Sequence, residues 1–214
     1  MPGRNSSKPN LYFLIMYYLH KTIGLSKPGS EDHLNKTLNF TISAVLLYGI
    51  CSGIVMSFLN SDDIKVSTEA VLQVFITVHT LSVYVILIRK HKTIHDILYL
   101  LRTEFNYFEE SLCIKSSEFW KTESNKTIYQ VAVIFVMILS YILLSILGTK
   151  FYSNKYEDRK LIYPTWFPFS IETNWYYLGI FIECLVFSIH GLVNLFSISL
   201  FGGAANLFCA FTQI

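Results

Sequence analysis

Charged residues are scarce in this sequence: Asp, Glu, Lys and Arg make up 15% of its 214 residues, against about 25% in a typical soluble domain. This scarcity excludes a disordered chain, a coiled coil and an ordinary cytosolic enzyme. The net charge of +2 is too small to indicate a nucleic-acid-binding surface. Apolar residues make up 52% of the sequence, and aromatic residues make up 16%.

Sequence motifs that are typical of nucleotide binding, metal binding and redox chemistry are absent as well. The sequence has no Gly-rich phosphate loop, no HExxH and no CxxC. His91 and His95 have a spacing that can bind a metal on a helix, but no second histidine box accompanies them, which favours the solvated end of a basic helix. We therefore expect that the chain is not an enzyme and that it has no catalytic residue, cofactor or metal. No cysteine falls in a predicted outer loop, so no disulfide framework is expected.

Long uncharged runs are abundant. Residues 37–61, 70–88 and 127–149 contain no charged side chain, and a fourth apolar run from Trp175 onward is interrupted only by Glu183. Each run is long enough for a membrane-spanning helix, and none alternates as barrel strands do. The sequence predicts an all-α membrane protein, a bundle of four transmembrane helices at about 37–59, 69–88, 127–149 and 175–201.

The first 36 residues form a segment ahead of a transmembrane helical domain that covers residues 37–214. Residues 11–19 are apolar, but no small-residue cleavage site follows them, which argues against a signal peptide. We expect an N-terminal interfacial helix instead, with Tyr12, Tyr17 and Tyr18 at the level of the lipid headgroups.

Basic residues are distributed unevenly between the two sides of the predicted membrane. Segments 1–36 and 89–126 hold five and seven Lys or Arg residues, whereas loops 60–69 and 150–174 hold one and four. Because basic segments stay on the cytoplasmic side, both ends are expected in the cytoplasm of a multi-pass plasma-membrane protein. Within 89–126, apolar residues at helical spacing predict a further helix.

Two glycine pairs are typical of close helix packing. Gly49 and Gly53 form a GxxxG motif in the first span, which lets another helix approach closely. Gly202 and Gly203 lie in the last apolar run, which as one helix exceeds the thickness of a bilayer core. The helix is expected either to continue into the cytoplasm or to bend at this pair.

Polar residues inside the predicted spans form stripes at helical spacing. They are Glu183, His190 and Asn194 in the fourth span, Gln73, Thr77, His79, Thr80 and Tyr84 in the second, and Tyr141 and Ser145 in the third. Ionisable groups within a span usually face the protein interior or a water-filled cavity. Two interpretations stay open: a cavity for a small, mostly apolar molecule, or hydrogen bonds that hold the helices together.

The segment before the fourth span carries a recognisable motif. Residues 163–169 read Tyr-Pro-Thr-Trp-Phe-Pro-Phe, which resembles the loop before the fourth helix of insect odorant receptors, where a Pro-x-Trp-aromatic-Pro-aromatic segment recurs. Residues 23–28, Ile-Gly-Leu-Ser-Lys-Pro, resemble the Gly-Leu-Trp-Pro segment that often precedes their first helix. Ser170 departs from the family, which commonly has Asp there.

The resemblance implies an odorant receptor subunit that detects small volatile, mostly apolar ligands as part of a ligand-gated cation channel with the olfactory co-receptor. Family members have seven helices, so the chain looks like a truncated receptor, an isoform or an incomplete gene model. The family binds odorants among the outer halves of these helices, which makes the candidate ligand-binding residues Gln73, Thr77, His79, Thr80, Tyr141, Ser145, Glu183, Phe187 and His190. The alternatives are a gustatory-receptor relative or a four-helix membrane accessory or scaffold protein without a ligand.

Overall fold

The computed structural model describes residues 11–25, 33–103, 116–152, 164–169 and 175–212, and every regular element in these ranges is a helix. The expected all-α class is therefore confirmed for the described part of the chain. The helices are α1 (Leu11–Thr22), α2 (His33–Leu59), α3 (Ile64–Arg89), α4 (His91–Thr103), α6 (Ser116–Tyr152) and α7 (Tyr176–Thr212). Helix α4 is the one expected within 89–126.

Three helices are long and apolar enough to cross a membrane: His33–Leu59, Ile64–Arg89 and, within α7, Tyr176–Asn206. They match the first, second and fourth predicted spans, the last of which begins one residue before α7. The predicted third span, 127–149, lies within α6, and the side chains of several of its residues lie outside the described part of the chain. The structure thus supports a membrane protein with three candidate spans, and the fourth stays a prediction.

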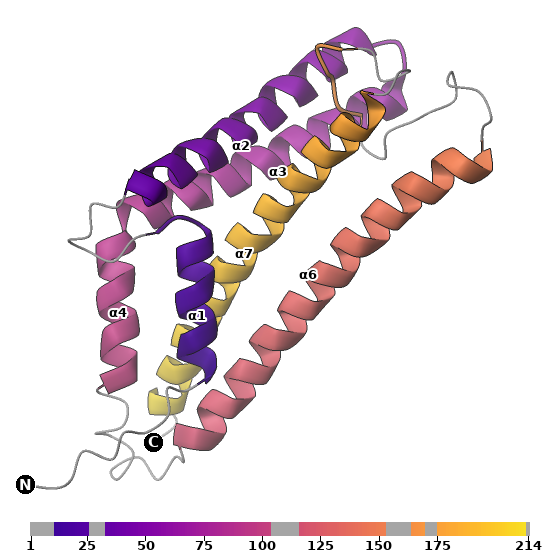
Figure 1. Cartoon of the computed structure of the whole chain (residues 1–214). Helices are drawn as coiled ribbons and strands as arrows, with labels where there is room; N and C mark the ends of the chain where they lie inside the picture. Colours follow the sequence, from indigo (N-terminus) through magenta and orange to yellow (C-terminus); the bar gives the residue numbers. More distant parts are fainter. Residues whose placement is uncertain (1–10, 26–32, 104–115, 153–163, 170–174, 213–214) are drawn as a thin grey trace, which may run out of the picture.

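Helices α2 and α3 form an antiparallel hairpin, and α7 packs along it (Figure 1). Helix α6 contacts α7 and α1. One end of the molecule, here named the turn end, holds the turn Asn60–Asp63, residues 164–169 and the start of α7. The opposite end, named the α1 end, holds α1, α4 and the last turns of α7 (Figure 1).

The GxxxG glycines lie where α2 meets α3, as the sequence predicted. A Cβ atom on Gly53 would lie 2.6 Å from Cγ2 of Val74 and 3.3 Å from the carbonyl oxygen of Ala70. A Cβ on Gly49 would lie 3.4 Å from Cγ2 of Thr77. The absence of side chains therefore lets the two backbones approach, which fixes the hairpin along this contact.

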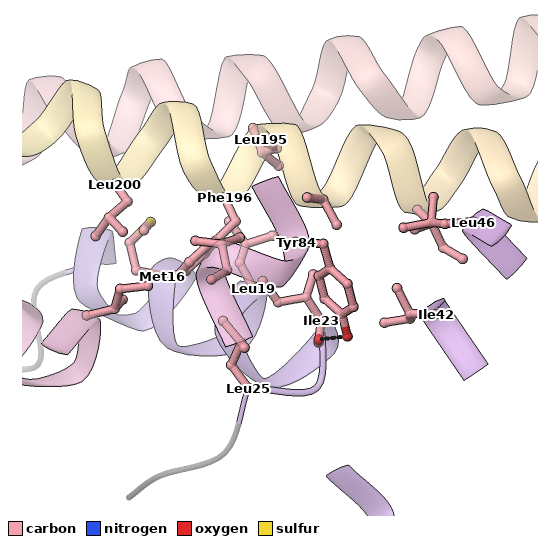
Figure 2. Packing of buried hydrophobic residues seen from close by; sticks show 14 of the residues in the cluster. Met16, Leu19, Ile23, Leu25, Ile42, Leu46, Tyr84, Leu195, Phe196 and Leu200 are labelled. Atoms are coloured by element: carbon pink, nitrogen blue, oxygen red, sulfur yellow. Dashed lines mark hydrogen bonds between the residues drawn. The ribbon is translucent and has the colours of Figure 1, made fainter. Parts of the chain in front are cut away.

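A cluster of buried apolar residues holds α1 against the bundle (Figure 2). Met16 and Phe196 are completely buried, where α1 crosses α7. The hydroxyl of Tyr84 on α3 donates to the carbonyl oxygen of Ile23, 3.0 Å away, just after α1. Apolar burial of this kind is the main force that fixes an element in place, so α1 is an integral part of the fold.

Tyr12 differs from the expectation for an interfacial helix. Its ring is 1% exposed, and its hydroxyl donates to the carbonyl oxygen of Ser199 on α7, 2.9 Å away. Burial, with the carboxylate of Glu123 nearby, raises the pKa of Tyr12, so the phenol stays neutral and remains a donor. Tyr17 and Tyr18 are exposed, as expected.

Helix α7 continues through Gly202 and Gly203 as one helix. Gly203 lies directly against the Tyr12 hydroxyl and so serves close packing, whereas a Cβ at Gly202 would meet nothing within 4 Å. Beyond this contact, Nδ2 of Asn206 donates to Oε1 of Glu123 on α6 at 3.1 Å. Of the two expectations for the end of this helix, continuation beyond the span is the one observed.

Candidate functional site

A cavity of about 410 Å³ lies among α2, α3, α7 and residues 164–169, toward the turn end. Its size falls within the range of small-molecule sites in proteins, roughly 300–1,000 Å³. The described residues that line it are Tyr48, Gly49, Glu69, Leu72, Gln73, Ile76, Thr165, Ile182, Glu183, Val186, Phe187 and His190.

Residues 164–169, here named the capping segment, are fastened to α2. The hydroxyl of Ser52 accepts from the backbone N–H of Trp166 at 3.0 Å and lies 3.1 Å from its carbonyl oxygen, and the hydroxyl of Tyr48 donates to the same carbonyl at 2.9 Å. The ring of Phe167 is buried and stacks on Phe169, with centroids 5.2 Å apart. This anchoring places the neighbouring Thr165 in the wall of the cavity.

The buried side-chain atoms without a hydrogen-bond partner include Oε1 of Gln73, Oγ1 of Thr165 and Nε2 of His190, whose residues line the cavity. A buried polar atom left unsatisfied costs about 1–3 kcal/mol, so such atoms are exceptional and call for an explanation. They come from α3, the capping segment and α7. Each of these atoms is itself inaccessible to water, so it lies within the packing around the cavity.

The structure brings four of the nine predicted site residues into the cavity wall: Gln73, Glu183, Phe187 and His190. His79 is exposed and is not among the described lining residues. The side chains of Tyr141 and Ser145 on α6 lie outside the described part of the chain.

Thr77 and Thr80 are buried on α3, but neither lines the cavity. Each hydroxyl donates to a carbonyl of its own helix, that of Gln73 at 2.8 Å and that of Ile76 at 3.0 Å. Oγ1 of Thr80 also accepts from Nδ2 of Asn194 on α7, at 3.3 Å. The hydrogen bond between Thr80 and Asn194 therefore joins two helices, as the second interpretation of the polar stripes expects.

The sequence analysis did not identify Tyr48, Glu69 and Thr165 as cavity residues. Tyr48 and Ser52 lie one turn apart in the first predicted span, and this polar pair was the signal for a contact on that face. Thr165 lies in the motif at 163–169, whose residue pattern does not by itself indicate a cavity. Glu69 lies at the boundary of a predicted span, where a charge is ordinary.

A second group of ionisable residues lies at the α1 end. His20 on α1 is 6% exposed and packs against Phe196, with ring centroids 5.8 Å apart. Burial, and then the positive charges that His95 and His91 can carry, lowers the pKa of His20 to about 4. Among the described residues no group of three or more His, Cys, Asp or Glu side chains is placed to hold a metal ion.

Comparison with known proteins finds no matching family model, no matching curated protein and no matching solved structure.

Proposed function

We propose that this chain is a membrane receptor subunit of the insect odorant receptor type, which binds a small, mostly apolar molecule in the cavity. In this proposal it acts in the plasma membrane as part of a ligand-gated cation channel that also contains the olfactory co-receptor. The cavity has a binding role and no catalytic one.

The observation that carries the proposal is the cavity of about 410 Å³, which is lined mostly by apolar residues and by a few polar ones. Apolar walls supply most of the affinity for a small ligand, and a few polar groups orient it. The wall includes Thr165, which belongs to the motif at 163–169 that resembles the family.

The distribution of basic residues supports the orientation in this proposal. The basic segments 1–36 and 89–126 would lie in the cytoplasm. The turn end and its cavity would then lie toward the outside, where a volatile molecule arrives.

The test replaces Phe187, which lines the cavity, with Trp, so that the larger ring fills the ligand space. The matched control is Phe181→Trp, because Phe181 is exposed on the same helix. The full chain and both variants are expressed with the olfactory co-receptor, and currents are recorded under a panel of volatile compounds. Phe187→Trp is expected to shift the dose–response curve by about tenfold or more, since overpacking costs roughly 1–3 kcal/mol.

Surface expression of each variant is measured alongside the current. Equal dose–response curves for the two variants would show that the cavity is not the ligand site. A normal surface level with no current from any compound, with or without the co-receptor, would refute the receptor role.

A further inference from the structure

We propose that the junction of α3 and α4, together with the end of α1, binds the headgroup of an anionic phospholipid. The site consists of four basic side chains, here named the basic cluster: Lys21, Arg89, Lys90 and Lys92. This inference goes beyond the proposed function and does not depend on the cavity, which lies toward the other end of the molecule.

The fold assembles the basic cluster from two separate stretches of the chain. Arg89 ends α3, Lys90 is its C-cap and α4 follows directly, whereas Lys21 lies in the last turn of α1. The two stretches meet where the hydroxyl of Tyr84 on α3 donates to the carbonyl oxygen of Ile23, 3.0 Å away. Buried apolar residues from all three helices belong to the same cluster as Tyr84: Leu19, Leu87 and Ile94. This packing holds the end of α1 beside the junction of α3 and α4.

The positive charge of the basic cluster is exposed to an anion from outside. All four side chains are exposed, and within the described part of the chain none of them has an ion pair or a side-chain hydrogen bond. The sequences of α1 and α4 contain one acidic residue, Asp96. Clusters of about four to eight Lys or Arg residues beside the end of a membrane span are typical of sites for anionic lipids. The charge of this surface therefore complements such a headgroup.

The position of the basic cluster favours a lipid over a soluble anion. A candidate span ends at Arg89, so the cluster lies where the hydrocarbon of a bilayer would give way to headgroups. Tyr17 and Tyr18 are exposed on α1, and Ile97 and Leu100 are exposed on α4. Aromatic and aliphatic side chains beside basic ones are typical of helices at a membrane surface. A phospholipid offers its headgroup to the basic cluster and its acyl chains to these side chains, whereas a free anion offers only charge.

The test compares two lipids with the same acyl chains, dioleoyl phosphatidylserine and dioleoyl phosphatidylcholine. Each is titrated into the full chain in detergent micelles, and bound lipid is counted by native mass spectrometry. Each basic residue near an anionic headgroup contributes about fivefold in affinity, so phosphatidylserine is expected to bind at least about tenfold more tightly. Raising the ionic strength from about 0.15 M to about 1 M, which shortens the Debye length from about 8 Å to about 3 Å, is expected to reduce this preference.

The variant Lys90→Gln removes one charge from the basic cluster. It is expected to weaken phosphatidylserine binding by about fivefold and to leave phosphatidylcholine binding unchanged within about twofold, and adding Lys92→Gln is expected to bring the loss to about tenfold or more. The matched control is Lys65→Gln, the same substitution at an exposed position in the first turn of α3, at the opposite end of that helix. Should Lys90→Gln fail to fold, Lys21→Gln on α1 is expected to give the same loss of about fivefold.

Equal affinity of the parent chain for the two lipids would overturn this inference, and so would an equal loss in Lys90→Gln and Lys65→Gln. Binding of a polyglutamate peptide in place of phosphatidylserine would assign the basic cluster to an acidic protein partner and would overturn the lipid assignment as well. None of these outcomes bears on the cavity, which is tested separately by Phe187→Trp.

Discussion

At the scale of single residues, His20 makes the docking of α1 sensitive to pH. The buried imidazole has a pKa of about 4, whereas the ordinary value is 6.5. Between these two pH values the unfolded chain binds a proton that the folded chain does not, so the free energy of unfolding falls as the pH is lowered through this window. At pH 5 the loss relative to pH 7 is expected to be roughly 2 kcal/mol.

Thermal unfolding of the full chain between pH 7.5 and pH 5 measures this effect. The variant His20→Leu removes the titrating group and is expected to show a smaller fall in the unfolding midpoint. The variant His33→Leu, at an exposed position at the start of α2, is the control and is expected to behave as the parent chain does. The same pH dependence in all three proteins would contradict the role of His20.

The two adjacent glycines of α7 make a second test at the residue scale. A Cβ atom at Gly203 would overlap the hydroxyl of Tyr12, whereas a Cβ at Gly202 meets nothing within 4 Å. Gly203→Ala is therefore expected to destabilise the chain by about 1–3 kcal/mol. Gly202→Ala is expected to be neutral or to stabilise it by up to about 1 kcal/mol, because Ala favours a helix over Gly.

The free energy of unfolding of both variants is measured by chemical denaturation. The unfolding is followed by the fluorescence of a label attached near Leu11 on α1. The comparison is sharp because the two substitutions add the same atoms at adjacent positions of one helix. Equal stabilities for Gly203→Ala and Gly202→Ala would show that Tyr12 is not held against α7.

At the scale of elements, the capping segment depends on its anchor to α2. Ser52→Ala removes a hydroxyl that accepts from the N–H of Trp166 and donates to its carbonyl oxygen. The carbonyl keeps its hydrogen bond from Tyr48, but the N–H of Trp166 loses its acceptor. Leaving this N–H unpaired costs about 1–3 kcal/mol, so local opening of the segment becomes at least about fivefold more frequent.

Hydrogen exchange of the Trp166 amide, followed by mass spectrometry of the peptide that contains it, measures this opening. Ser82→Ala is the control, because the Ser82 hydroxyl is exposed and bonds only to the carbonyl of Val78 in its own helix. Faster exchange is expected in Ser52→Ala alone. Unchanged exchange in that variant would mean that Tyr48 and the aromatic stack hold the segment without Ser52.

At the scale of the whole molecule, the fold constrains where the described helices begin and end. The start of α2 and the end of α7 lie at the same end of the molecule (Figure 1). Together with the basic residues of 1–36 and 89–126, this arrangement predicts that both ends face the cytoplasm. Epitope tags at each end are expected to be stained only after the cells are permeabilised.

A tag in the turn Asn60–Asp63 is the matched control, since this turn lies at the opposite end of the hairpin. It is expected to be stained in intact cells. Staining of either terminal tag in intact cells would reverse the orientation and place the cavity on the cytoplasmic side.

The positions of the candidate spans along the chain can be read from the sequence. Three candidate spans coincide with long uncharged runs, because a backbone in lipid must satisfy its hydrogen bonds within a helix. The packing role of Gly49 and Gly53 was also readable, since a GxxxG spacing puts both glycines on one face. Gln73, Glu183 and His190 were identified as cavity candidates because a polar residue in an apolar run is visible without any structure.

What each polar side chain faces depends on how the helices pack against one another. Gln73, Thr80 and His79 share a short stretch of α3, yet the first lines the cavity, the second bonds to α7 and the third is exposed. The rotation of a helix about its own axis is set by the helices packed against it, and a stripe on one sequence does not contain that information. In the same way Tyr12 is buried because Gly203, in a helix far along the chain, leaves room for its hydroxyl.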